Sequence, residues 1–185
     1  MLNARMTKSE VEKELQGKGV FVQIDHLNRF LKEPIGIEMK KFVYLKLAAL
    51  YETGKLLSEA AKMYENAANV SIAFTEKITH HMKVAETYVK LGAFDRIDHA
   101  IKNAMGEANS REREEIQISL KQMLREQAKV LETGLKRNQA AKFYERLLDM
   151  RLSDQERREA KERLLDLYRK VGKLHEALTL EKSLG

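Results

Sequence analysis

The sequence has no cysteine, no tryptophan and a single proline among its 185 residues. Without cysteine the chain has no disulfide framework, no thiolate nucleophile and no cysteine-type zinc site. The near absence of proline, together with abundant alanine, leucine, glutamate, lysine and arginine, favours an all-helical chain. A chain of this length is expected to form one domain that buries its own core without disulfides or metals.

A long apolar run is also lacking. The longest stretch without a charged side chain covers residues 66–75 and mixes polar with apolar residues, whereas a membrane-spanning helix needs about 20 apolar residues. Near the start, Arg5 and Lys8 are not followed by an apolar segment, so no signal peptide is predicted. We therefore expect a cytoplasmic protein.

Positive charge is in modest excess. The chain has 34 lysines and arginines against 28 aspartates and glutamates, and residues 111–185 hold 18 of these basic and 14 of these acidic side chains. Such an excess favours weak attraction to nucleic acids or acidic proteins. Because acidic residues are interleaved with the basic ones, no strong positive field is expected.

The most informative feature that is present is a pattern that occurs twice, eighty residues apart. The shared residues are Glu-Thr-Gly at 52–54 and 132–134, Ala-Ala-Lys at 60–62 and 140–142, Tyr-Glu at 64–65 and 144–145, and Tyr, Lys and Gly at 88, 90 and 92 and at 168, 170 and 172. A fixed offset over this length indicates an internal duplication. Duplicated helical material is typical of a helical repeat array.

Four glycines divide the helical pattern. Gly54, Gly92, Gly134 and Gly172 are separated by 38, 42 and 38 residues. Each is expected to end a helix in the left-handed conformation, with a second helix after a short loop. The sequence thus predicts four antiparallel αα-hairpins, which must stack because a single hairpin cannot bury its apolar face. Their predicted ranges are 37–72, 75–106, 110–151 and 153–184.

The remaining boundaries follow from spacing and from capping residues. Apolar residues at helical spacing predict a further helix from Val20, within a single repeat domain at 20–185, whereas residues 1–19 are expected to form a flexible segment. The predicted helix starts are Ser9 with Glu12 and Ser153 with Glu156 as capping boxes, and Ser58 and Thr75 as N-caps.

At these residues the chain resembles the tetratricopeptide-like superfamily of helical repeats. The segment YVKLGAFDRIDHAIKNA at 88–104 follows the superfamily's tyrosine, glycine, aromatic, small and bulky order, with Gly92, Phe94 and Ala104 among the matching positions. Residues 50–68 follow it with one extra residue after the glycine, and the resemblance extends over residues 37–184. The spacings exceed the 34 residues of the standard repeat, and longer, proline-poor repeats are similar to those of soluble NSF-attachment proteins.

The resemblance implies an all-α, right-handed α-solenoid of about four antiparallel hairpins with an N-terminal helix. It also implies a scaffold or adaptor that binds a partner protein, because the first helix of each hairpin in this superfamily lines a concave binding surface. Packing of Tyr44 and Met82 between helices is the alternative to partner contact. The implied contact residues are Lys41, Tyr44, Met82, Lys83, Lys90, Lys121, Leu124, Arg125, Arg163 and Lys170.

Some members of this superfamily clamp the C-terminal carboxylate of a peptide with a set of lysine, asparagine and arginine side chains. Only Lys121 and Arg125 match that set here, so a full carboxylate clamp is not expected. The sequence names no partner, and no cofactor is predicted.

Catalytic chemistry finds little support in the sequence. There is no G-x-S-x-G motif, phosphate-binding loop or dinucleotide-binding glycine pattern, so we do not expect an enzyme. Glu76 lies one turn before His80, but the adjacent His81 points about 100° away and no third ligand is evident. His80 and His81 are therefore interpreted as polar histidines on a helix surface rather than as metal ligands.

Two alternatives to the scaffold interpretation remain open. One is RNA or DNA binding through the basic second half, although acidic neighbours dilute this set. The other is a self-associating structural subunit, possible as a homodimer, with Leu178, Leu180 and Leu184 as contacts. The basic residues of the first alternative are Lys136, Arg137, Lys142, Arg146, Arg157 and Arg158.

Overall fold

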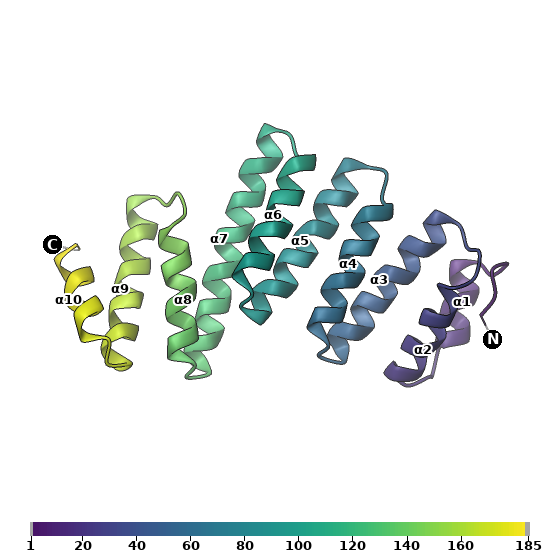
Figure 1. Ribbon diagram of the computed structural model, residues 1–185, viewed down its shortest axis with the longest axis horizontal. Helices are drawn as coiled ribbons and strands as arrows, with labels where there is room; N and C mark the ends of the chain where they lie inside the picture. The colour runs from purple at the N-terminus through teal and green to yellow at the C-terminus, as the bar shows by residue number, and fades with distance from the viewer. Residues whose placement is uncertain (1, 184–185) are drawn as a thin grey trace. The chain divides into compact units, whose positions relative to one another are not determined.

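A computed structural model describes residues 2–183, and these residues confirm the all-α helical repeat fold (Figure 1). The helices are Lys8–Leu15 (α1), Val20–Phe30 (α2), Ile37–Thr53 (α3), Leu57–Val70 (α4), Phe74–Leu91 (α5), Phe94–Glu107 (α6), Ser110–Thr133 (α7), Arg137–Leu148 (α8), Asp154–Lys170 (α9) and Leu174–Lys182 (α10). The chain divides into two compact units, Met1–Ile116 and Gln117–Gly185, so the boundary lies within α7.

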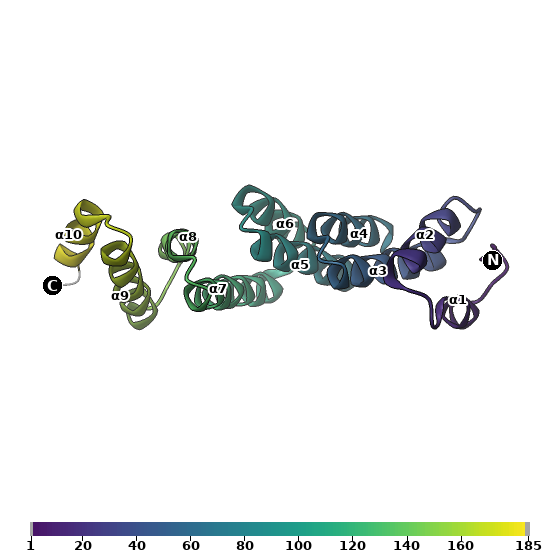
Figure 2. The same cartoon turned by 90° about the horizontal axis from the view of Figure 1, so that it is seen from below.

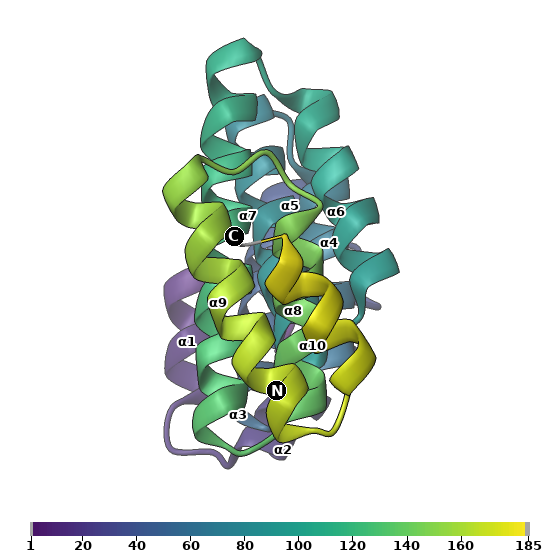
Figure 3. The same ribbon diagram turned by 90° about the vertical axis from the view of Figure 1, so that its left-hand side faces the viewer.

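Each unit is a stack of antiparallel hairpins in chain order. We call α3, α5, α7 and α9 the first helices, and α4, α6, α8 and α10 the second helices. In unit 1, α4 packs against both α3 and α5, and α5 packs against α6. Figure 2 shows α3 and α5 in one layer and α4 and α6 in the other. In unit 2, α9 packs between α8 and α10, and Figure 3 shows α10 beside α9.

Small residues on the second helices allow this close packing. Ala60, Ala61, Ala67 and Ala68 of α4 are buried, as are their counterparts Ala140 and Ala141 in α8. An alanine at the contact lets two helix axes approach more closely than a leucine does. Tyr64 and Tyr144 are also buried beside these alanines. Helices α4 and α8 thus each bury small alanines together with a large tyrosine inside their own unit.

The turns between first and second helices correct the prediction for two of the four glycines. Gly92 and Gly172 have left-handed φ values of 68° and 78°. Gly54, in contrast, has φ of −78°, and the left-handed residue is Lys55 with φ of 59°. Leu135 takes the same role after Gly134, with φ of 57°. In both turns the residue directly after Glu-Thr-Gly, which is Lys55 or Leu135, thus takes the left-handed conformation.

All four turns nevertheless close in the same way. In a Schellman motif the N–H after the left-handed residue donates to a carbonyl five residues earlier, which satisfies a free group at the helix end. The same turn is therefore built with or without glycine at its left-handed position. The bonds run from Leu56 to Tyr51 (2.8 Å), Ala93 to Tyr88 (3.1 Å), Lys136 to Leu131 (2.8 Å) and Lys173 to Tyr168 (2.9 Å).

The capping predictions are confirmed at one helix and wrong at three. Ser153 and Glu156 form the expected capping box at α9. At α1 the box is made by Thr7 and Glu10 instead of Ser9 and Glu12. Neither α4 nor α5 has a side-chain cap, because each begins one residue before its predicted cap, Ser58 or Thr75. Each of the three wrong predictions thus lies two residues after the N-cap that the structure shows, which is Thr7, Leu56 or Ala73.

The N-terminal segment is part of the core, contrary to the prediction of a flexible segment at 1–19. Leu2, Val11 and Leu15 are buried in one apolar cluster. The other members of the cluster come from α2, α3 and the loop that joins them, including Leu27 and Leu47. Apolar side chains of α1 thus belong to the same buried cluster as those of α2 and α3.

Candidate functional site

The candidate site is the set of charged and aromatic side chains on the first helices. In unit 1, Lys41 of α3 donates to Glu38 at 3.0 Å and to Glu76 of α5 at 2.9 Å. The Lys41 side chain is only 13% exposed. The hydrogen bond that Lys41 donates to Glu76 and, with a smaller effect, the one that it donates to Glu38 raise the pKa of Lys41. The bond from Lys41 lowers the pKa of Glu76 in turn. Lys41 therefore joins two first helices.

Unit 2 contains the same ion pair eighty residues later. Lys121 of α7 lies 3.2 Å from Glu156 of α9, and Arg125 lies 3.2 Å from the same carboxylate. Glu156 also accepts the backbone N–H of Ser153 at 2.9 Å as part of the capping box. The bond from Ser153, reinforced by Lys121 and Arg125, lowers the pKa of Glu156 to about 2. The duplicated pattern thus includes an ion pair that the sequence comparison had not revealed.

The two residues that match a carboxylate clamp already bind an internal carboxylate. Lys121 and Arg125 both contact Glu156, so a partner's carboxylate would have to displace it. Leu124, predicted to contact a partner, is 1% exposed and packs in the core of unit 2. Its helix turns this position inward, whereas Lys121 and Arg125 lie toward the surface. Leu124 is therefore removed from the candidate surface.

A second duplicated contact joins the helices within each hairpin. The Tyr64 hydroxyl donates to Glu52 at 3.0 Å, and the Tyr144 hydroxyl donates to Glu132 at 2.5 Å. Burial, followed by the bond to the carboxylate, raises the pKa of both tyrosines. The sequence analysis identified these tyrosines only as part of the duplicated pattern. A tyrosine and a glutamate twelve residues apart, repeated at a fixed offset, were the signal that could have predicted the bond.

The remaining cations on the first helices also make ion pairs. Lys83 and Lys90 both contact Glu86, at 2.8 Å and 2.9 Å, and Lys90 reaches Glu52 at 3.5 Å. Burial raises the pKa of Glu86, but the bonds from Lys83 and Lys90 outweigh it, so the net pKa is lowered.

The cations on the first helices of unit 2 are also paired with carboxylates. Arg163 lies 3.9 Å from Glu132, and Lys170 lies 2.6 Å from Asp166. Every cation of the predicted partner-binding set is therefore paired with a carboxylate. Tyr44 and Met82 in unit 1 are half-buried, so each retains some accessible surface.

His80 and His81 lie inside unit 1, and the prediction of surface histidines is wrong. Each side chain is 9% exposed, because α5 is flanked by both α4 and α6 and the two divergent rings are both covered. Burial lowers the pKa of each ring. The Nδ1 atom of His81 is buried without a hydrogen-bond partner. Over residues 2–183, no three metal-ligating side chains of the types His, Cys, Asp and Glu come together.

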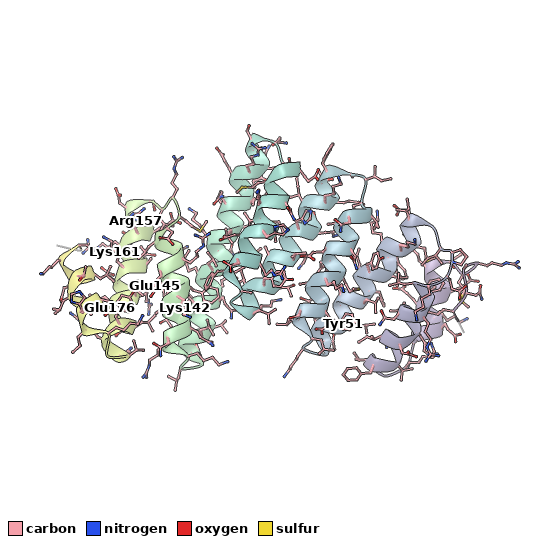
Figure 4. The ribbon with its side chains drawn as sticks, in the orientation of Figure 1. Tyr51, Lys142, Glu145, Arg157, Lys161 and Glu176 are labelled. Atoms are coloured by element: carbon pink, nitrogen blue, oxygen red, sulfur yellow. The ribbon has the colours of Figure 1, made fainter. Side chains whose placement is uncertain are left out.

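Three of the six basic residues of the nucleic-acid alternative already have partners within the chain. Arg157 donates to the backbone carbonyl of Leu148 at 3.3 Å, which caps the end of α8. Arg158 pairs with Glu162 at 3.1 Å, and Arg146 lies 3.9 Å from Asp149. Arg157 and the exposed Lys142 belong to different helices (Figure 4). Among the described residues, the members that are exposed and make no ion pair are Lys136, Arg137 and Lys142.

A polar hollow in unit 1 was not predicted from the sequence. It has a volume of about 510 Å³ and opens between α1, α2 and α3. Its position could not be seen in the sequence because five of its seven lining residues come from a segment expected to be flexible. The lining residues are Ser9, Glu12, Lys13, Leu15, Gln16, Gln23 and Lys46.

The residues predicted for self-association are partly outside the described chain. Leu178 of α10 is 59% exposed, and Leu180 is half-buried. Leu184 lies outside the described residues. Over residues 2–183, no helix has the length and apolar character needed to cross a membrane.

Comparison with known proteins leaves the chain without an assigned relative. No protein-family model matches the sequence, and no curated protein matches it at a significant level.

Proposed function

We propose that this protein is a scaffold that binds a partner protein on the outward faces of its first helices, as a member of the tetratricopeptide-like superfamily. The observation that carries the proposal is the pairing of cations with carboxylates across these helices, from Lys41 with Glu76 to Lys121 with Glu156. Within each unit, the first helices therefore offer both signs of charge. Protein partners recognise such surfaces through complementary charges that set orientation and encounter rate.

Half-buried side chains between the charges add to this support. Tyr44 and Met82 each keep part of their surface accessible on α3 and α5. Tyrosine and methionine are both enriched at protein interfaces, where an aromatic or flexible apolar body fills a partner's pocket. A surface of fixed charges with accessible apolar side chains suits a partner helix or extended segment.

Nucleic-acid binding is the second candidate, and it depends on fewer groups. A phosphate backbone binds by replacing counterions with unpaired lysines and arginines. Lys136, Arg137 and Lys142 are exposed and make no ion pair within the described residues. Three such cations would give a modest salt dependence, with a slope of about three in a log–log plot. The variant Lys136→Glu with Lys142→Glu should abolish gel shifts at physiological salt if this candidate is correct.

The test of the scaffold function is affinity capture from a lysate of the organism that encodes the protein, at moderate salt, with identification by mass spectrometry. The test variant is Lys83→Glu with Lys90→Glu, which reverses charge on the exposed face of α5. The matched control is Lys62→Glu, an exposed lysine of α4 in the other layer. We expect the control to retain the wild-type partner and the double variant to lose it. Equal capture by all three proteins would overturn the proposal.

A further inference from the structure

We infer that the hollow between α1, α2 and α3 binds an extended acidic peptide segment of the partner, an inference that rests on the proposed function. The hollow measures about 510 Å³, which is large enough for a few residues of an extended chain. All of its lining residues belong to unit 1, so one compact unit holds the complete site. Its floor is Leu15, which is buried in the core cluster.

The walls carry one free cation and one that is shared. Lys13 is exposed and makes no ion pair with any residue from 2 to 183. Lys46 of α3 lies 3.2 Å from Glu12 of α1 and is 35% exposed. A carboxylate entering the hollow would meet the Lys13 ammonium directly and could share Lys46 with Glu12. Attraction to a negative side chain is therefore stronger here than at a fully neutralised pair.

The uncharged groups of the lining match a peptide backbone. Gln23 donates its amide nitrogen to the Lys18 carbonyl at 2.6 Å, which leaves its amide oxygen to accept a partner's N–H. The side chain of Gln16 makes no hydrogen bond within the described residues, and it can both donate and accept. An extended peptide presents N–H and C=O groups in alternation, so these two glutamines can bind it from both sides.

A nucleic-acid strand fits the same hollow less well. Its phosphates carry only acceptors, so they cannot use the free amide oxygen of Gln23, which needs an N–H donor. Glu12 also contributes a carboxylate that is 53% exposed at the wall and would repel a phosphate. A peptide can place an N–H donor toward Glu12 and its own carboxylate toward Lys13. The chemistry of the lining thus favours an acidic peptide over a phosphate backbone.

Ion pairs connect α1, which lines the hollow, with the proposed binding face on α3 and α5. Lys8 of α1 lies 3.8 Å from Glu38 of α3, and Glu38 also contacts Lys41, which pairs with Glu76 of α5. This chain of ion pairs runs from the edge of α1 across α3 to α5. A partner bound on α3 and α5 can therefore extend an acidic segment into the hollow without leaving a charged surface.

The test is a titration of isotopically labelled protein, followed by amide chemical shifts at physiological salt. The probe is an N-acetylated, C-amidated peptide of six glutamates, and the comparison ligands are a six-lysine peptide, glutarate and a short DNA duplex. We expect hexaglutamate to shift the resonances of residues 9–16, 23 and 46. Lys13→Glu should raise the dissociation constant about fivefold, because it reverses an unpaired charge at the edge of the site. Lys32→Glu, which changes an exposed lysine in the loop after α2, should leave the dissociation constant unchanged.

Several results would overturn the inference. They are an absence of shifts at millimolar hexaglutamate, equal shifts with hexalysine or DNA, glutarate binding as tightly as the peptide, and equal weakening by Lys13→Glu and Lys32→Glu. If hexaglutamate fails to bind while partner capture still depends on Lys83 and Lys90, the hollow inference fails alone. If capture shows no such dependence, the proposed function fails whatever the titration gives.

Discussion

The two copies of the duplicated pattern keep the same internal bonds and differ in the surfaces around them. The ion pair of Lys41 with Glu76 returns as Lys121 with Glu156, and the bond of Tyr64 to Glu52 returns as Tyr144 to Glu132. Both contacts join one helix to another. The residues retained in both copies thus include those that hold helices together, and these packing contacts are the same in the two units.

Several differences between the copies lie where the described residues show no side-chain hydrogen bond or ion pair between helices. Leu56 and Leu57 at the start of α4 correspond to Lys136 and Arg137 at the start of α8. The buried His80 corresponds to Ala160, and the half-buried Met63 to the buried Phe143. The two units therefore differ in some buried side chains and in some surface charges, while they share the bonds between helices described above. The predictions below test which of these differences matter.

The largest expected effect is a difference in stability loss when equivalent core residues of the two units are shortened. Phe143 is one of the largest fully buried side chains, so Phe143→Ala should destabilise unit 2 by about 3–5 kcal/mol. Met63→Ala at the equivalent position should cost about half as much, because Met63 is only half-buried. Hydrogen exchange would measure the opening free energy of each unit separately. Equal losses would show that the two interiors are packed alike.

The next effect separates the two kinds of turn. Gly92→Ala places a side chain at φ of 68° and should cost about 1–2 kcal/mol. Gly54→Ala should change stability by less than about 0.5 kcal/mol, since its φ is −78° and an added Cβ would meet the Leu50 carbonyl at an ordinary 3.5 Å. Urea denaturation followed by circular dichroism would compare them. A larger loss at Gly54 than at Gly92 contradicts the assignment of the left-handed residues.

A smaller effect separates the two copies of the ion pair. Glu156→Gln should cost about 1 kcal/mol at neutral pH, because it weakens a capping box and removes a carboxylate shared by Lys121 and Arg125. Glu76→Gln should cost less, because Glu76 has no capping role and is more exposed.

The pH dependence of the unfolding free energy tests the contribution of Glu156 in a second way. The folded pKa of Glu156 is lowered to about 2, so its contribution is present above the ordinary glutamate pKa of about 4.3 and is lost as the pH falls toward 2. Unfolding free energies measured between pH 6 and 2 should therefore converge for the wild type and Glu156→Gln. Parallel curves over this range would refute the role assigned to Glu156.

The smallest expected effect distinguishes unit 1 by its buried histidines. Burial lowers the folded pKa of His80 and His81, so below the unfolded pKa of about 6.5 the unfolded chain binds more protons than the folded one. Acidification should therefore destabilise unit 1, and the loss should level off below the folded pKa values. His81→Gln should reduce the slope of stability against pH between 6.5 and 5, while hydrogen exchange in unit 2 stays unchanged. An unaltered slope would show that His81 is not involved.

The sequence by itself determined the helical class, the duplication and the approximate hairpin ranges. These features depend on residues near one another along the chain: apolar periodicity, the near absence of proline, and glycines at nearly regular intervals. The capping box of Ser153 and Glu156 belongs to the same group, because all its atoms lie within one helical turn.

Only the tertiary structure decided what the individual side chains do. Lys41 meets Glu76, and Lys121 meets Glu156, across 35 residues of sequence. His80 and His81 are buried because helices on both sides cover α5. The polar hollow exists because α1, expected to be flexible, docks beside α3. Burial and ion pairing depend on which segments pack together, and local patterns carry little information about that choice.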